Sequence, residues 1–138
     1  MIYKRTVNYY ETDRMSFVHH SNYIRYFEEA RVWILEQFGL PYADIEKRGI
    51  LIPVLGVNVK YMRYLTFGDN IDIDTRITKF SGVKMSVGYE VSKNGETAAK
   101  GESSHCFLEA GTFRPVNLKT EHPDIYEAFS LMAEKTKK

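Results

Sequence analysis

The chain has 138 residues, of which 43% are hydrophobic and 14% aromatic, enough to fill the core of one ordinary domain. Its 19 basic and 18 acidic residues give a formal charge of +1, so the chain lacks the large basic excess of a general nucleic-acid-binding protein. The lone Cys106 excludes an internal disulfide and favours a cytoplasmic protein. No signal peptide or membrane span is visible, and we expect one domain over residues 1–138.

The first predicted elements are a strand over residues 2–9 and a long helix over residues 22–38. Apolar side chains in the second segment recur at three- and four-residue steps, which is the pattern of an amphipathic helix. Ser21 or Asn22 can cap its start through a side-chain oxygen. A short second helix is expected over residues 42–48.

From about residue 50 the hydrophobic period changes to two, the period of strands that bury one face. Asn94-Gly95 predicts a two-residue hairpin between two of these strands. A C-terminal helix is expected at about residues 122–136. The alternating strands are predicted over residues 57–62, 71–78, 83–91 and 96–110.

One long helix precedes four strands that each have a single apolar face. The economical architecture is α+β, with a curved antiparallel β-sheet wrapped around one long central helix. Such an open sheet leaves unpaired edge strands, which favour pairing with a second copy. We therefore expect a homodimer or a homotetramer.

Six short segments occur in a characteristic order along residues 3–118, and together they resemble one family. They are Tyr10-Glu11-Thr12-Asp13 through Asn22-Tyr23, Phe27-Glu28-Glu29-Ala30-Arg31, Gly49-Ile50 with Pro53-Val54, Gly68-Asp69, Gly101 through Phe107, and Arg114-Pro115. In this order the sequence resembles the hotdog-fold acyl-CoA thioesterases of the 4-hydroxybenzoyl-CoA thioesterase type. The resemblance implies a hotdog fold and hydrolysis of a thioester to free acid and CoA.

The resemblance also implies the chemistry of the segment between the first strand and the helix. Asp13 would be the catalytic carboxylate, acting either as the nucleophile or as a general base on water. The main-chain N–H of His20, at the helix start, would polarise the thioester carbonyl. Adjacent His19 and His20 point in different directions, so we expect no metal site.

Substrate-binding residues follow from the same resemblance. Tyr9, Asn22 and Tyr23 are candidates for the pocket lining. Lys84 and Ser86 are candidates for contacts with the nucleotide phosphates. The expected partner is acyl-CoA or an acyl-carrier protein, with no cofactor because CoA is part of the substrate.

Two rival functions stay open at this point. A hydratase or dehydratase on the same fold also combines an Asp with a His, and Asp13 precedes His19 and His20 here. A non-catalytic acyl-CoA-binding module is the other, because Ser16 stands where the family usually has Gly. The acyl group and the choice between dimer and tetramer are also open.

Overall fold

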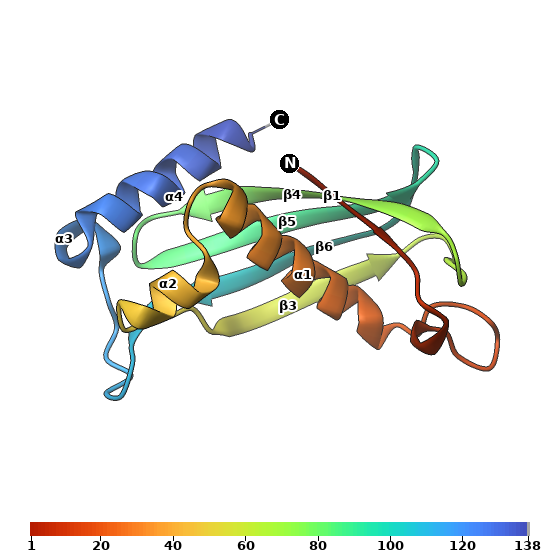
Figure 1. Ribbon diagram of the computed structural model, residues 1–138, viewed down its shortest axis with the longest axis horizontal. Helices are drawn as coiled ribbons and strands as arrows, with labels where there is room; N and C mark the ends of the chain where they lie inside the picture. The colour runs from red at the N-terminus through yellow and green to blue at the C-terminus, as the bar shows by residue number, and fades with distance from the viewer. Residues whose placement is uncertain (138) are drawn as a thin grey trace.

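The computed structural model describes residues 1–137, and its centre is an antiparallel sheet of five strands. The order of the strands across the sheet is β1-β4-β5-β6-β3 (Figure 1). The first edge strand therefore pairs with β4, and the strand that follows the helices pairs with β6. The strands are β1 (Ile2–Thr6), β3 (Val54–Tyr61), β4 (Asn70–Phe80), β5 (Lys84–Lys93) and β6 (Glu96–Cys106).

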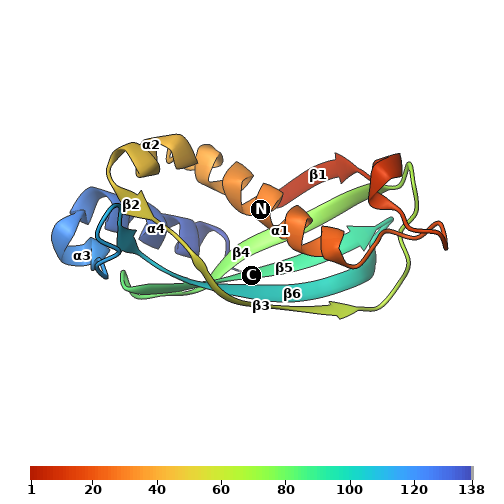
Figure 2. The ribbon, with the colours of Figure 1, turned by 90° about the horizontal axis from the view of Figure 1, so that it is seen from below.

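The helices lie on one side of this sheet and leave its other face uncovered (Figure 2). The long helix α1 crosses the middle of the covered face, and a C-terminal helix contacts β4. The helices are α1 (Ser21–Gln37), α2 (Tyr42–Lys47), α3 (Leu118–Glu121) and α4 (Pro123–Lys135), with a 3-10 turn η1 (Tyr9–Glu11). Two short strands, β2 (Ile50–Leu51) and β7 (Leu108–Glu109), pair separately. No helix in this described region is long and apolar enough to cross a bilayer.

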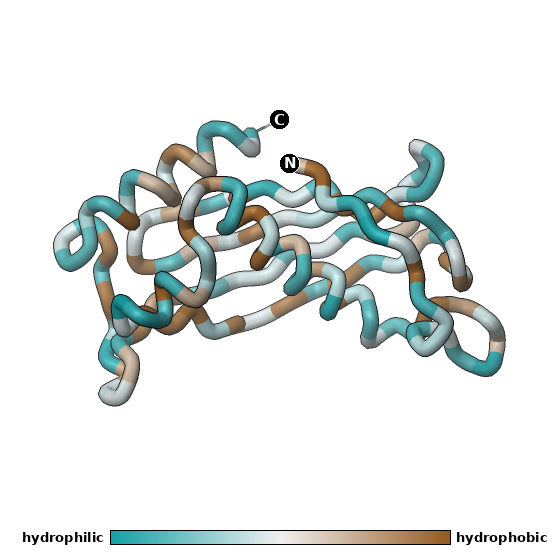
Figure 3. The backbone as a smooth tube through the Cα atoms, in the orientation of Figure 1, coloured by the Kyte–Doolittle hydropathy of each residue, from teal (hydrophilic) through white to brown (hydrophobic). Residues whose placement is uncertain are grey.

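Hydrophobic patterning explains the two layers, and it is visible along the tube in Figure 3. In β4, Ile71, Ile73, Thr75 and Ile77 are buried, whereas the alternate residues Asp72, Asp74 and Arg76 are partly exposed. In α1, Tyr23, Phe27, Ala30 and Ile34 are buried on the face that lies over the sheet. Burial of these apolar side chains is the main force that holds helix and sheet together.

One glycine sets how closely α1 approaches the sheet. A Cβ atom at Gly101 would lie 2.5 Å from the Phe27 ring and 2.5 Å from the carbonyl oxygen of Asn58. Without that atom, the Phe27 ring stacks on the Tyr89 ring with centroids 4.2 Å apart. Gly101 thereby lets an aromatic ring of the central helix lie directly on the strand backbone.

The fold confirms the predicted hotdog architecture and the α+β class. The hairpin at Asn94-Gly95 is also confirmed, because φ is 51° and 79° at its two residues, as a tight turn between twisted strands requires. The first strand ends at Thr6 rather than at residue 9, because the chain turns into η1. The strand predicted over 96–110 is divided after Cys106 into β6 and β7.

Candidate active site

The segment between η1 and α1 is a small hairpin-like loop that presents Asp13. Thr12 and Val18 form an isolated β-bridge, and the Asp13 N–H donates to the Phe17 carbonyl at 2.8 Å. The Ser16 N–H donates to the Asp13 carbonyl at 2.9 Å. Backbone hydrogen bonds therefore fix the main chain on both sides of the Asp13 side chain.

Asp13 is half-buried and has one carboxylate oxygen available. Its Oδ1 accepts the Met15 N–H at 2.9 Å, whereas Oδ2 has no donor within residues 1–137. The side chain lines a cleft of about 430 Å³. The cleft also contains His20, Tyr23, Tyr61 and six other residues: Met15, Phe17, Val18, Met62, Arg63 and Tyr64.

His20 precedes α1 and lines the same cleft as Asp13. Its N–H has no acceptor in the described part of the chain, as expected for the first turn of a helix. Its carbonyl accepts the Tyr61 hydroxyl at 3.1 Å, which ties the helix start to the end of β3. Asp13, which has an uncommitted carboxylate oxygen, and His20, which has an uncommitted N–H, thus both line one cleft. The positive end of the helix dipole favours an anion there.

Tyr23 forms the buried wall of the cleft, and its ring contacts Tyr61 edge-on with centroids 5.0 Å apart. Burial, together with the neighbouring Tyr61, raises the pKa of the Tyr23 hydroxyl to about 12. The hydroxyl therefore stays protonated at neutral pH and is a hydrogen-bond donor rather than a base.

A buried ion-pair network lies beneath the loop, and it is centred on Glu11. The Glu11 carboxylate accepts Arg5 Nη2 at 2.6 Å, the Tyr26 hydroxyl at 3.0 Å and the Asn8 N–H at 2.8 Å. Its carbonyl accepts the His19 N–H at 2.8 Å. Glu11 therefore anchors the end of the loop that carries His20. The spacing Asn8-x-x-Glu11 is the sequence signal of a capping box, and it could have identified this role.

Two predicted pocket residues occupy structural positions instead of facing the cleft. Asn22 is buried, and its Nδ2 donates to the Glu11 carbonyl at 2.8 Å. It lines a second groove on the other side of Asp13. Tyr9 is 75% exposed and packs edge-on against Phe67, outside the cleft.

Lys84 and Ser86 lie at the other end of the sheet within the same protomer. Lys84 pairs with Cys106, whereas Tyr61 beside the cleft pairs with Ala99. Roughly 23 Å of strand separates the two ends. The structure therefore brings together Asp13, His20 and Tyr23 but leaves Lys84 and Ser86 remote within one chain.

Ser16 occupies a backbone conformation that explains why glycine is usual there. Its φ is 67°, in the left-handed region that is costly for residues with a Cβ. We expect Ser16→Gly to raise the free energy of unfolding by up to about 1 kcal/mol. The relief of backbone strain in the folded protein should exceed the entropy that glycine adds to the unfolded chain. Activity should be unchanged.

Urea denaturation of wild type and Ser16→Gly measures this effect. Met15→Gly is the control, because Met15 is exposed and does not have a positive φ, so this change should lower stability. A less stable Ser16→Gly protein would contradict the strain at this turn.

No group of three His, Cys, Asp or Glu side chains that could hold a metal ion occurs among residues 1–137. The two adjacent histidines instead stack on each other with ring centroids 4.1 Å apart. His19 Nδ1 is hydrogen-bonded to Ser21 Oγ at 2.9 Å.

The antiparallel sheet wrapped around one central helix defines the hotdog fold. The family model that matches, described as the Thioesterase-like superfamily, covers residues 7–129. The chain therefore belongs to the Thioesterase-like superfamily.

Similar proteins agree with this assignment. A Bacillus subtilis protein provisionally named acyl-CoA thioesterase YneP is 35% identical over 133 residues, which cover 96% of this chain and 94% of that one. The crystal structure of a DHNA-CoA thioesterase from Staphylococcus aureus superposes with a TM-score of 0.91 at 32% identity, covering 99% and 95% of the two chains. A hypothetical protein from Thermus thermophilus, TT1821, gives 0.87 at 34% identity, covering 95% and 98%.

Proposed function

We propose that this protein hydrolyses acyl-CoA thioesters to a free carboxylic acid and CoA, without a cofactor. The observation that carries the proposal is the cleft shared by Asp13, with a free carboxylate oxygen, and His20, with a free N–H. Membership of the superfamily and the names of two relatives support it. The lone Cys106 is consistent with a cytoplasmic location.

Two routes of hydrolysis fit this geometry. In one, Asp13 Oδ2 attacks the carbonyl carbon, the thiolate leaves, and water cleaves the resulting mixed anhydride. In the other, Asp13 takes a proton from water, and the hydroxide attacks while the thiolate leaves. In both routes the carbonyl oxygen becomes negative, and the His20 N–H would stabilise it by about 3 kcal/mol.

Hydrolysis of a panel of aliphatic and aromatic acyl-CoA substrates tests the proposal. Release of free thiol, followed with a colour reagent, is the expected result. A change in the absorbance of an enoyl-CoA without thiol release would establish the hydratase instead. Binding of acyl-CoA without either reaction would establish the non-catalytic module.

We also propose that the functional oligomer contains a dimer in which the β3 strands of two protomers pair. This edge strand is eight residues long and exposes Val54, Leu55, Val57 and Tyr61. The other edge, β1, has only five residues, so it offers fewer backbone groups for pairing. Antiparallel pairing about the centre of β3 would place Val54 opposite the partner's Tyr61.

The dimer predicts that Val57→Lys yields monomers, because a lysine on an edge strand opposes pairing. Size-exclusion chromatography with light scattering measures the mass. Ile2→Lys on the opposite edge is the matched control and should stay dimeric, since Ile2 is exposed to a similar extent. A dimeric Val57→Lys protein would place the interface elsewhere.

A nucleotide contact for Lys84 remains a proposal, since the second protomer would have to bring this exposed residue to the substrate. Lys84→Ala should then raise KM for acyl-CoA about two- to fivefold, with kcat nearly unchanged, as loss of an exposed ionic contact does. Lys47→Ala on α2 is the control. An unchanged KM would place the phosphates elsewhere, with Arg63 beside the cleft as the next candidate.

A further inference from the structure

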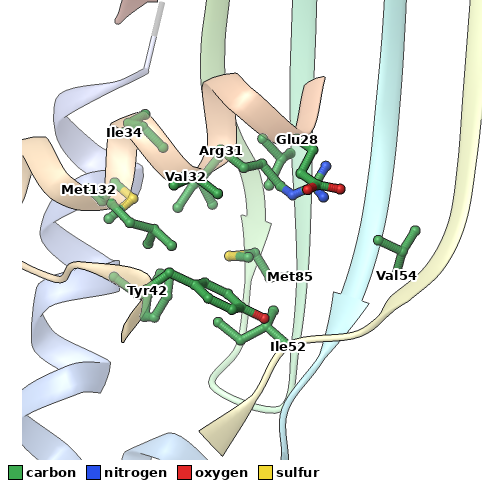
Figure 4. Close-up of a pocket in the computed structure, with 13 residues that line it drawn as sticks. Glu28, Arg31, Val32, Ile34, Tyr42, Ile52, Val54, Met85 and Met132 are labelled. Atoms are coloured by element: carbon green, nitrogen blue, oxygen red, sulfur yellow. The ribbon is translucent and has the colours of Figure 1, made fainter. Parts of the chain in front are cut away.

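A second cavity lies under the C-terminal half of α1, away from Asp13. It measures about 300 Å³ and is enclosed by α1, α2, β5, α4 and the segment before β3 (Figure 4). His20 and Arg31 are separated by roughly 16 Å along the helix. Its walls are largely apolar and include Tyr42, Val54, Met85, Phe129 and Met132.

The polar groups of this cavity are Glu28 and Arg31, together with the Tyr42 hydroxyl. Figure 4 shows the Arg31 guanidinium and the Glu28 carboxylate on one side of it. Arg31 is half-buried, yet no carboxylate of residues 1–137 lies within the 4.0 Å of an ion pair. Its one hydrogen bond runs from Nη1 to the Tyr89 hydroxyl at 3.0 Å. The remaining N–H groups of Arg31 have no protein acceptor within residues 1–137 and are therefore available to a ligand.

A chain of buried hydrogen bonds fixes the position of Arg31. Tyr89 Oη and Ser103 Oγ are 2.7 Å apart, Ser103 Oγ and His105 Nε2 are 2.8 Å apart, and His105 Nδ1 lies 3.2 Å from the Pro53 carbonyl. The carbonyl only accepts, so His105 Nδ1 carries the proton and Nε2 accepts from Ser103. Because the Arg31 guanidinium only donates, the Tyr89 hydroxyl accepts from it and donates to Ser103 Oγ, and the Ser103 hydroxyl donates to His105 Nε2.

Every hydrogen bond between the Arg31 guanidinium and the Pro53 carbonyl therefore has one donor and one acceptor. Phe27 stacks on the Tyr89 ring and limits its movement. Burial, and then the nearby Arg31 charge, lower the pKa of His105 to about 4, which agrees with its neutral form. The cation is held in place before any ligand arrives, which reduces the entropy lost on binding.

We propose that this cavity binds a monocarboxylic acid with an apolar chain, with the carboxylate on Arg31 and the chain between α1, β5 and α4. A guanidinium pairs with a carboxylate through two parallel hydrogen bonds, and the apolar walls favour a hydrocarbon body. This binding site is separate from the Asp13 cleft, where we propose that hydrolysis takes place. With β3 paired as proposed, Val54 on the cavity wall would lie beside the partner's Tyr61, so an acid released in one cleft would form next to this site.

Calorimetric titration with octanoate, and with 1-octanol as the uncharged match, tests the proposal. Wild-type protein should bind octanoate at least tenfold more tightly than octanol. Arg31→Gln should remove that difference, and Tyr89→Phe should reduce it, because Arg31 loses its acceptor. Arg25→Gln is the control, since this exposed arginine of α1 bonds to Asn22 outside the cavity. Glu28→Gln should strengthen octanoate binding by removing a competing charge.

Methionine methyl signals locate the ligand independently of any hydrolysis. Met85 and Met132 line the cavity, whereas Met15 and Met62 line the Asp13 cleft. Octanoate should shift the first pair in wild type and leave it unshifted in Arg31→Gln, whose spectrum also shows whether the variant is folded. Absence of octanoate binding, equal binding of octanoate by wild type and Arg31→Gln, or shifts of Met15 and Met62 alone would each overturn the proposal. None of these results bears on the role of Asp13.

Discussion

Asp13→Asn is expected to lower kcat for thioester hydrolysis by about 10³-fold while the protein stays folded and oligomeric. A positioned carboxylate that accepts a proton or attacks directly contributes about 10²- to 10⁴-fold, and an amide does neither. The asparagine Oδ1 can still accept the Met15 N–H, so the loop that presents residue 13 keeps its hydrogen bonds. Thiol release at saturating acyl-CoA measures the effect.

The matched control for this variant is Asp44→Asn, because Asp44 is an exposed carboxylate at the start of α2. It should hydrolyse acyl-CoA at the wild-type rate. Comparable rates in wild type and Asp13→Asn would remove Asp13 from the mechanism. Loss of the oligomer in Asp13→Asn would instead assign it a structural role.

Protein stability is expected to fall by about 3 kcal/mol between pH 7 and pH 4 through His105 alone. Its pKa is about 4 in the folded chain and 6.5 ordinarily, because burial and then Arg31 disfavour the imidazolium. Below pH 6.5 the unfolded chain binds a proton that the folded chain does not. The stabilisation is therefore complete above pH 6.5 and is lost as the pH falls toward 4.

Urea denaturation across this pH range, in wild type and in His105→Gln, isolates the contribution of the histidine from that of the carboxylates. The variant should be less stable at pH 7, and its stability should depend less on pH. His122→Gln is the control, since His122 lies at the surface beside Arg48. Parallel pH profiles for wild type and His105→Gln would contradict the neutral, buried state of His105.

The local pattern of the sequence is sufficient for the long helix, the C-terminal helix, the long strands and the turn at Asn94-Gly95, but not for η1, α3, β2 or β7. It could not give the order of the strands, because β3 and β6 pair across about forty to fifty residues and no local signal encodes that contact. The same limit applies to Arg31, whose orientation depends on Tyr89, Ser103 and His105 on two other strands.

The candidate site was predicted from family resemblance more than from pattern. Asp13 and His20 line one cleft, as the resemblance implies, although their catalytic roles remain proposals. Glu11 carries a charge, and charged residues usually lie at the surface, yet Glu11 is 3% exposed and paired with Arg5. The same resemblance implies a nucleotide contact for Lys84, which within one chain lies at the other end of the sheet from the cleft.

The most direct test of the central claim is a crystal structure with a non-hydrolysable ketone analogue of acyl-CoA, in which a methylene group replaces the thioester sulfur. We predict the analogue's carbonyl oxygen within about 3 Å of the His20 N–H, the distance at which such donors act. Either an Asp13 oxygen, or a water molecule hydrogen-bonded to it, should lie about 3 to 3.5 Å from the carbonyl carbon. A carbonyl that contacts neither group, with the acyl portion bound away from this cleft, would contradict the account.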